Sequence, residues 1–136
     1  MGTIFVAYGE PGHRNRVLEF AVEQAAASEH ELFVYHIQEH DDESAKHTRE
    51  EIAGVIERTD PTVTADVRIN TRSEPSDLTN VSKRALLTEA ILESDRNFEY
   101  VVMGDVERDT LEGLAHASMT EAVLETHAIP VLLVPV

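Results

Sequence analysis

The sequence predicts one α/β domain built around a parallel sheet with helices on both faces, and three observations carry that prediction. The chain has 136 residues, close to the commonest size of a single domain, so residues 1–136 are taken as one unit. Hydrophobic residues make up 42% of the chain, which is enough for a packed core. Short apolar runs alternate with helical stripes from end to end, and this alternation is typical of parallel sheets.

The first half of the chain contains two expected strands, each followed by an expected helix. Residues 3–8 are rich in Ile, Phe and Val, which favour a strand, and a turn with two glycines and a proline follows. Helical spacing predicts a helix over residues 13–28 that buries Val17, Leu18, Ala21, Val22, Ala25 and Ala26. Residues 31–37 are expected to form a strand, and residues 43–58 a helix that buries Ala45, Ile52, Ala53 and Ile56.

The second half supplies three more expected strands and two helices. Polar Thr64, Asp66 and Arg68 alternate with apolar neighbours in a strand at residues 63–69, so one of its faces should be buried and the other wet. Polar loops are expected at residues 70–79 and 105–117, helices at 80–94 and 119–127, and strands at 100–103 and 130–136. Two inner runs are apolar throughout, as in strands covered on both faces: Phe33-Val34-Tyr35 and Val101-Val102-Met103.

The charge balance excludes one class of partner. Asp and Glu number 26 and Lys and Arg 11, a formal net charge of −15. Such a chain repels phosphate backbones and has no basic stripe, so nucleic acid is not an expected partner. The acids are scattered over the whole chain, which favours a halophilic source whose salt screens their repulsion; an ordinary acidic protein is the alternative.

The composition also bears on location. The absence of cysteine excludes disulfides, thiolate catalysis and Cys-based metal sites. No apolar run approaches the roughly 20 residues that span a bilayer. The first residues lack the basic segment of a signal peptide. A cytoplasmic protein without a membrane partner is therefore expected.

Three segments together resemble the universal stress protein family. They are Ile4-Phe5-Val6-Ala7-Tyr8-Gly9, Tyr100-Val101-Val102-Met103-Gly104 and Ala128-Ile129-Pro130-Val131-Leu132-Leu133-Val134, and their order and spacing match the family along the whole chain. The resemblance implies a five-stranded parallel sheet in the order 3-2-1-4-5, the adenine nucleotide alpha-hydrolase-like arrangement. It also implies a homodimer and a role in stress responses.

Many members of the family bind ATP through a signature after the fourth strand: Gly, two residues, Gly, nine residues, Gly, then Ser or Thr. Glycines there let the backbone approach phosphates, and the following helix N-terminus attracts anions. Gly104 and Ser118 match the first and last positions, whereas Glu107 and Ala117 replace the other two glycines. The motif is therefore degraded.

Two effects oppose ATP at this loop. One base, Arg108, faces four acids: Asp105, Glu107, Asp109 and Glu112. A like-charge contact at about 4 Å costs about 1 kcal/mol in water, but molar salt shortens the Debye length to about 3 Å and screens it. A side chain where glycine is needed costs roughly 1–2 kcal/mol and blocks close approach, which salt does not relieve. The steric cost therefore outweighs the electrostatic one in high salt. No cofactor is expected, and ATP should bind weakly or not at all.

A vestigial nucleotide crevice is expected beyond the carboxyl ends of the first and fourth strands, where the strand order reverses. Tyr8, Gly9, Gly104 and Ser118 should bound it, and the resemblance adds the backbone of Ile37 at the end of the second strand. ATP binders of the family carry an Asp at the position of Tyr8. Tyr8 could stack on a planar ligand or fill the space of an adenine, and filling is favoured. Ser118 opens a capping-box pattern, so capping is favoured over phosphate contact.

Seven histidines raise the question of a metal site. The densest group spans a predicted strand, loop and helix, and no spacing forces it to converge: His36, His40, Asp41, Asp42 and His47. No metal is therefore expected, and His116 is the one histidine that could face the crevice. Neither a Gly-x-Ser-x-Gly elbow nor a P-loop is present, so no catalytic residue is expected.

Three functions remain open at this point. The favoured one is a non-enzymatic stress-response module that acts through dimerisation and an unknown protein partner. The second is an adenine-nucleotide switch with slow or no hydrolysis, and the third is an adenylating enzyme, which would lack its usual Ser-Gly-Gly-type loop after the first strand. The homodimer is expected through residues 130–136, because this edge strand is apolar on both faces.

Overall fold

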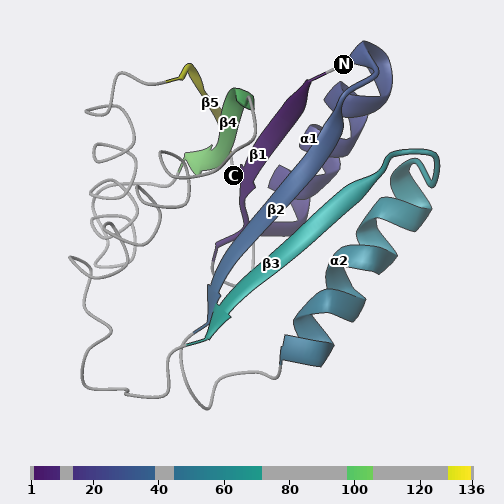
Figure 1. Cartoon of the computed structure of the whole chain (residues 1–136), viewed down its shortest axis with the longest axis vertical. Helices are drawn as coiled ribbons and strands as arrows, with labels where there is room; N and C mark the ends of the chain where they lie inside the picture. The colour runs from purple at the N-terminus through teal and green to yellow at the C-terminus, as the bar shows by residue number, and fades with distance from the viewer. Residues whose placement is uncertain (1, 10–13, 39–44, 72–97, 106–128, 136) are drawn as a thin grey trace.

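The computed structural model describes residues 2–9, 14–38, 45–71, 98–105 and 129–135. These residues form five strands and two helices (Figure 1): β1 (Thr3–Ala7), α1 (Arg14–Ser28), β2 (Glu31–Gln38), α2 (Ala45–Thr59), β3 (Ala65–Thr71), β4 (Phe98–Asp105) and β5 (Val131–Pro135). Each coincides with an element predicted from the sequence. The helices predicted at 80–94 and 119–127 lie outside the described residues, as does the loop predicted at 105–117 apart from its first residue.

All five strands belong to one sheet in the order β3-β2-β1-β4-β5, and every neighbouring pair is parallel. The fold class and strand order expected from the sequence are therefore confirmed. From β1 the chain runs outward through β2 to β3 and then returns to β4 on the other side of β1. In open parallel sheets, the carboxyl edge at such a reversal is where ligands bind.

The two described helices pack on the same face of the sheet (Figure 1). Under them lies the larger core cluster, whose buried residues are Ile4, Val6, Tyr8, Val17, Leu18, Ala21, Val22, Ala25, Leu32, Val34, Ile52, Val55, Val102 and Val134. The opposite face has a second buried cluster, rich in aromatic rings: Phe5, Phe33, Tyr35, Val101 and Met103. Because strand side chains alternate between faces, the two all-apolar inner runs supply both clusters, as predicted.

A β-bulge in the pairing of β1 with β4 determines on which face of the sheet the Phe98 side chain lies. Thr3 pairs with Phe98 and Ile4 with Tyr100, so Glu99 is an extra residue in β4. An extra residue reverses the alternation of side chains beyond it. Phe98 therefore packs edge to face on Phe5, with ring centroids 5.1 Å apart, on the aromatic side of the sheet. Tyr100 packs on the helix side.

The buried face of α2 matches the predicted one only in part: Ile52 is buried and Ile56 packs against the core, as expected. Thr48, Ile52 and Val55 are buried, whereas Ala53 is exposed and Ala45 is half-buried. The three buried residues follow the i, i+4, i+7 spacing of a single helix stripe. The prediction wrongly included Ala53, an apolar residue beside the stripe, and missed Thr48, because a threonine was not counted as a core residue.

Strand ends also differ from the predictions. β3 continues through Asn70 and Thr71, which the sequence placed in a loop, because both pair with β2. β4 extends to Asp105, so Gly104 lies inside the strand and pairs with Val134. Backbone pairing thus continues past the last apolar residue of each run. The predicted alternation of β3 is confirmed, since Asp66 and its polar neighbours are exposed and its apolar residues are half-buried.

Candidate functional site

The predicted site residues gather at the carboxyl edge of β1. Tyr8 and Gly9 follow β1 directly, and Gly104 lies near the end of β4. The register pairs Val6 with Val102, so Tyr8 and Gly104 each come two residues beyond that pair. Ile37 lies near the end of β2. These four residues therefore reach the same edge of the sheet, whereas Ser118 and the acidic loop before it lie outside the described residues.

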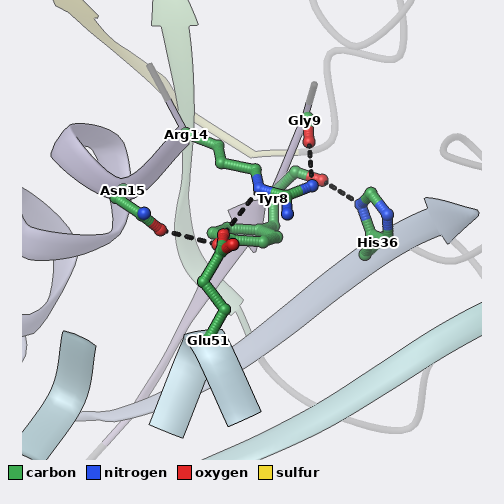
Figure 2. Close-up of polar contacts among 6 residues, drawn as sticks. All are labelled: Tyr8, Gly9, Arg14, Asn15, His36 and Glu51. Atoms are coloured by element: carbon green, nitrogen blue, oxygen red, sulfur yellow. Dashed lines mark hydrogen bonds and ion pairs between the residues drawn. The ribbon is translucent and has the colours of Figure 1, made fainter. Parts of the chain in front are cut away.

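Tyr8 points inward, toward the face covered by α1 and α2. Its side chain is 2% exposed, and the hydroxyl has partners from both helices (Figure 2). It donates to the Oε2 atom of Glu51 in α2, and Asn15 Oδ1 in α1 lies 2.6 Å away. Two acceptors thus compete for one phenolic hydrogen. The ring of Tyr8 fills the space beneath the end of β1.

Arg14, the first residue of α1, lies across the ring of Tyr8 (Figure 2). Its guanidinium carbon is 4.6 Å from the ring centroid, a cation–π distance. The Nε atom donates to Glu51 Oε2 at 2.9 Å, and Nη1 donates to the carbonyl of Gly9 at 3.3 Å. The Arg14 side chain is 3% exposed and that of Glu51 is 27% exposed. One face of the Tyr8 ring is therefore occupied by a buried cation.

The backbone of Tyr8 is also fully used within the chain. Its N–H donates to the carbonyl of Tyr35 at 2.9 Å. Its carbonyl oxygen lies 2.7 Å from Nδ1 of buried His36. Because a carbonyl only accepts, the hydrogen of this bond must be on Nδ1 of His36. The His36 ring meets the Tyr8 ring edge to face at a centroid distance of 5.7 Å.

The environment of Tyr8 keeps its phenol protonated. Burial raises the pKa of Tyr8 far above its ordinary value, the hydrogen bond to Glu51 raises it further, and the nearby Arg14 charge partly opposes both. Tyr8 is therefore a hydrogen-bond donor at any physiological pH. An uncompensated buried charge is strongly unfavourable, and the carboxylate of Glu51 supplies a compensating negative charge beside Arg14.

The sequence predictions missed most of this polar cluster, which consists of Tyr8, Arg14, Asn15, His36 and Glu51. The position of Arg14 gave one signal, because it precedes Val17 and Leu18 at the i, i+3 and i, i+4 spacing of a buried helix stripe. Nothing in the sequence indicated a buried contact for Glu51, because it lies among other charged residues of α2, which are usually exposed. Its role depends on the packing of α2 beside α1.

The histidine group divides in the structure. His36 is buried under Tyr8, whereas His47 is exposed on α2. His40, Asp41, Asp42 and His116 lie outside the described residues. Within the described part of the chain, no three His, Asp or Glu side chains gather in a way that would hold a metal ion.

These features define the class of protein: an α/β domain with an open parallel sheet in the order β3-β2-β1-β4-β5, whose polar cluster lies at the carboxyl edge where such sheets place their ligands. The sequence model of the Universal stress protein family matches residues 1–135, and the chain belongs to that family. Among curated proteins, no sequence match was found. No helix within the described ranges has the length and apolar character needed to cross a membrane.

Solved structures share this fold at low identity. A universal stress protein from Archaeoglobus fulgidus matches with a TM-score of 0.67 and 19% identity, over 98% of each chain. A universal stress protein in complex with cAMP matches with a TM-score of 0.64 and 18% identity, over 98% of this chain and 96% of that one. The universal stress protein from Archaeoglobus fulgidus in complex with dAMP matches with a TM-score of 0.60 and 18% identity, over 98% of this chain and 97% of that one. At such identities the likeness concerns the fold alone.

Proposed function

We propose that this chain is a non-enzymatic, cytoplasmic stress-response module that acts through a homodimer and protein contacts rather than through ATP. The observation that carries the proposal is the filled carboxyl end of β1. There the Tyr8 hydroxyl, the Tyr8 backbone and the Gly9 carbonyl all bond within the chain. A nucleotide entering at this point would have to displace those bonds.

The ring of Tyr8 supports the same proposal. A planar ligand stacked on Tyr8 would compete with Arg14 for one face of the ring, and His36 meets the ring at its edge. Filling of the site by Tyr8 is therefore favoured over stacking. The degraded glycine signature, with Glu107 and Ala117 in place of glycines, adds a second obstacle at the phosphate end.

Calorimetric titration with ATP in molar KCl tests this proposal. We expect a Kd no better than about 1 mM and no hydrolysis above the buffer rate. A repaired variant that combines Tyr8→Asp, Glu107→Gly and Ala117→Gly should bind at least roughly tenfold more tightly, because it restores the family's nucleotide-binding residues. Low-micromolar binding by the native chain would contradict the proposal.

An adenine-nucleotide switch is the second candidate. The observation that favours it is that two of the similar structures are complexes with cAMP and with dAMP. Such monophosphates have no β- and γ-phosphates, so they depend less on the glycine loop. Mass spectrometry of small molecules that co-purify in high salt separates the candidates: a stoichiometric adenine nucleotide favours the switch, and an empty protein favours the module.

The proposed homodimer pairs β5 with its symmetry mate in antiparallel fashion. The Pro130 carbonyl accepts from Val101 of β4 at 2.9 Å, so alternate residues of β5 turn their backbone groups away from β4. The residues that turn outward are Val131, Leu133 and Pro135. A two-fold axis at Leu133 would join two Leu133 residues by a pair of backbone bonds and set Val131 opposite Pro135, an isologous contact. The missing N–H of Pro135 would keep the ladder short.

A further inference from the structure

Among the described partners of the buried Arg14 guanidinium, Glu51 supplies the negative charge, and its side chain is partly exposed. The guanidinium is also held by the Gly9 carbonyl and by the ring of Tyr8, and neither contact involves Glu51. The Glu51 side chain is 27% exposed, against 3% for Arg14, so the carboxylate borders solvent and the cation does not. The guanidinium is thus held by contacts that do not involve Glu51 (Figure 2), and the carboxylate is the more exposed of the two charged groups.

Departure of Glu51 would leave Tyr8 and Arg14 with the other contacts described above. The Tyr8 hydroxyl would still have an acceptor, because Asn15 Oδ1 lies 2.6 Å away. Arg14 would keep its Gly9 bond and its position over the Tyr8 ring. Its departure would remove the negative oxygen on which the Arg14 Nε–H and the Tyr8 O–H converge. Two donors aimed at one point are the basic element of an oxyanion site.

We propose that Arg14 and Tyr8 form an oxyanion-binding site and that Glu51 is its built-in occupant, which a small carboxylate or phosphate monoester displaces. A ligand oxygen at the position of Glu51 Oε2 receives the same two donors, one of them charged. This site is built from β1, α1 and α2 and does not use the glycine signature after β4. It therefore goes beyond the proposed function and does not require ATP.

The affinity of this site for an oxyanion depends on the net charge of the chain and on the salt concentration. The chain carries a net charge of −15, which repels anions at low salt. High salt screens that repulsion at the surface, whereas the buried Arg14 remains poorly screened. Because Glu51 occupies the site most of the time, the apparent affinity for an oxyanion is the intrinsic affinity multiplied by the fraction of molecules in which Glu51 has left the site. The native chain therefore binds oxyanions weakly, and removal of Glu51 reveals the intrinsic affinity.

The test compares Glu51→Ala with the native chain and with Glu50→Ala, an exposed neighbour on α2 that serves as the matched control. Acetate and inorganic phosphate are titrated by calorimetry at constant ionic strength in KCl. Glu51→Ala should bind one of them at least tenfold more tightly than the other two proteins, and Arg14→Met added to it should abolish the gain. Acetate preference identifies a carboxylate ligand and phosphate preference a phosphate ligand. Equal binding by all three proteins would overturn the proposal.

A second measurement covers the case in which Glu51→Ala does not fold. Glu51→Gln keeps the size of the side chain, and the Arg14 Nε–H resonance can be followed by NMR in this variant and in the native chain. Phosphate or acetate should shift that resonance in both, with the midpoint at least tenfold lower in the variant, while chloride at equal ionic strength should not. An Arg14 resonance that responds to no oxyanion in either protein would refute the site.

Discussion

The two edge strands of the sheet, β3 and β5, differ in how easily another strand could pair with them. β3 exposes Asp66 and Arg68, and Arg49 of α2 donates to the outward carbonyl of Val67 at 3.0 Å. β5 contains no charged residue, and its Leu133 is 38% exposed. Charged side chains and an occupied carbonyl hinder the addition of another strand, whereas an apolar edge favours it. The described side chains therefore oppose the addition of a strand at β3 and do not oppose it at β5.

The largest effect on the proposed dimer is expected at Leu133, the most exposed large apolar residue of β5. Leu133→Lys would place two lysines opposite each other across the proposed axis and should weaken the dimer by roughly a hundredfold or more, because like charges directly opposite repel. Light scattering at high salt should then find monomers. Asp66→Lys on β3 is the matched control and should remain dimeric. A variant that stays dimeric, or a native protein that is monomeric, would exclude β5 as the interface.

Salt should stabilise the fold, because each copy of the chain carries a net charge of −15 and screening weakens the repulsion among its acids. Between about 0.1 M and about 2 M KCl, screening should stabilise the fold by about 2 kcal/mol, or roughly 8 °C in Tm. Differential scanning calorimetry measures this gain. Sucrose separates screening from solvent exclusion: a flat Tm in KCl, or an equal rise in sucrose, would reject a halophilic surface.

A smaller effect is expected at Pro135, which pairs with Val131 of the partner subunit in the proposed register. Pro135→Val supplies one N–H donor per subunit, and two added bonds should tighten the dimer by roughly tenfold. Sedimentation equilibrium gives the dissociation constant. Pro130→Val serves as the control, because the backbone of Pro130 faces β4 and not the edge. Equal gains from both variants would argue against an axis at Leu133.

The smallest effect is expected at Arg49. Arg49→Ala removes the donor to the Val67 carbonyl and should lower the free energy of unfolding by no more than about 1 kcal/mol. It should also permit weak association through β3, seen as a concentration-dependent shoulder in sedimentation velocity. Arg58→Ala, on the same helix, should produce no such shoulder. Identical profiles for the two variants would mean that Arg49 does not protect the edge.

Much of the sheet could be predicted because its signals are local. Period-two alternation located β3, and unbroken apolar runs located β2 and β4, since strands covered on both faces have no polar side. The ends of strands were less predictable. Asn70 and Thr71 have polar side chains, but their backbone pairs with β2, and backbone pairing does not depend on side-chain polarity.

The alternation of strands and helices, the acidic charge, the apolar character of β5 and the position of Tyr8 after β1 could all be predicted from local sequence patterns. Tertiary structure alone decided what surrounds Tyr8. Its partner Glu51 lies 43 residues away in the chain, and His36 lies 28 away. Those residues meet because parallel pairing sets β2 beside β1 and the crossover connections bring α2 beside α1. Side-chain patterns report which face of an element is buried, but the residue across the interface depends on how the elements pack.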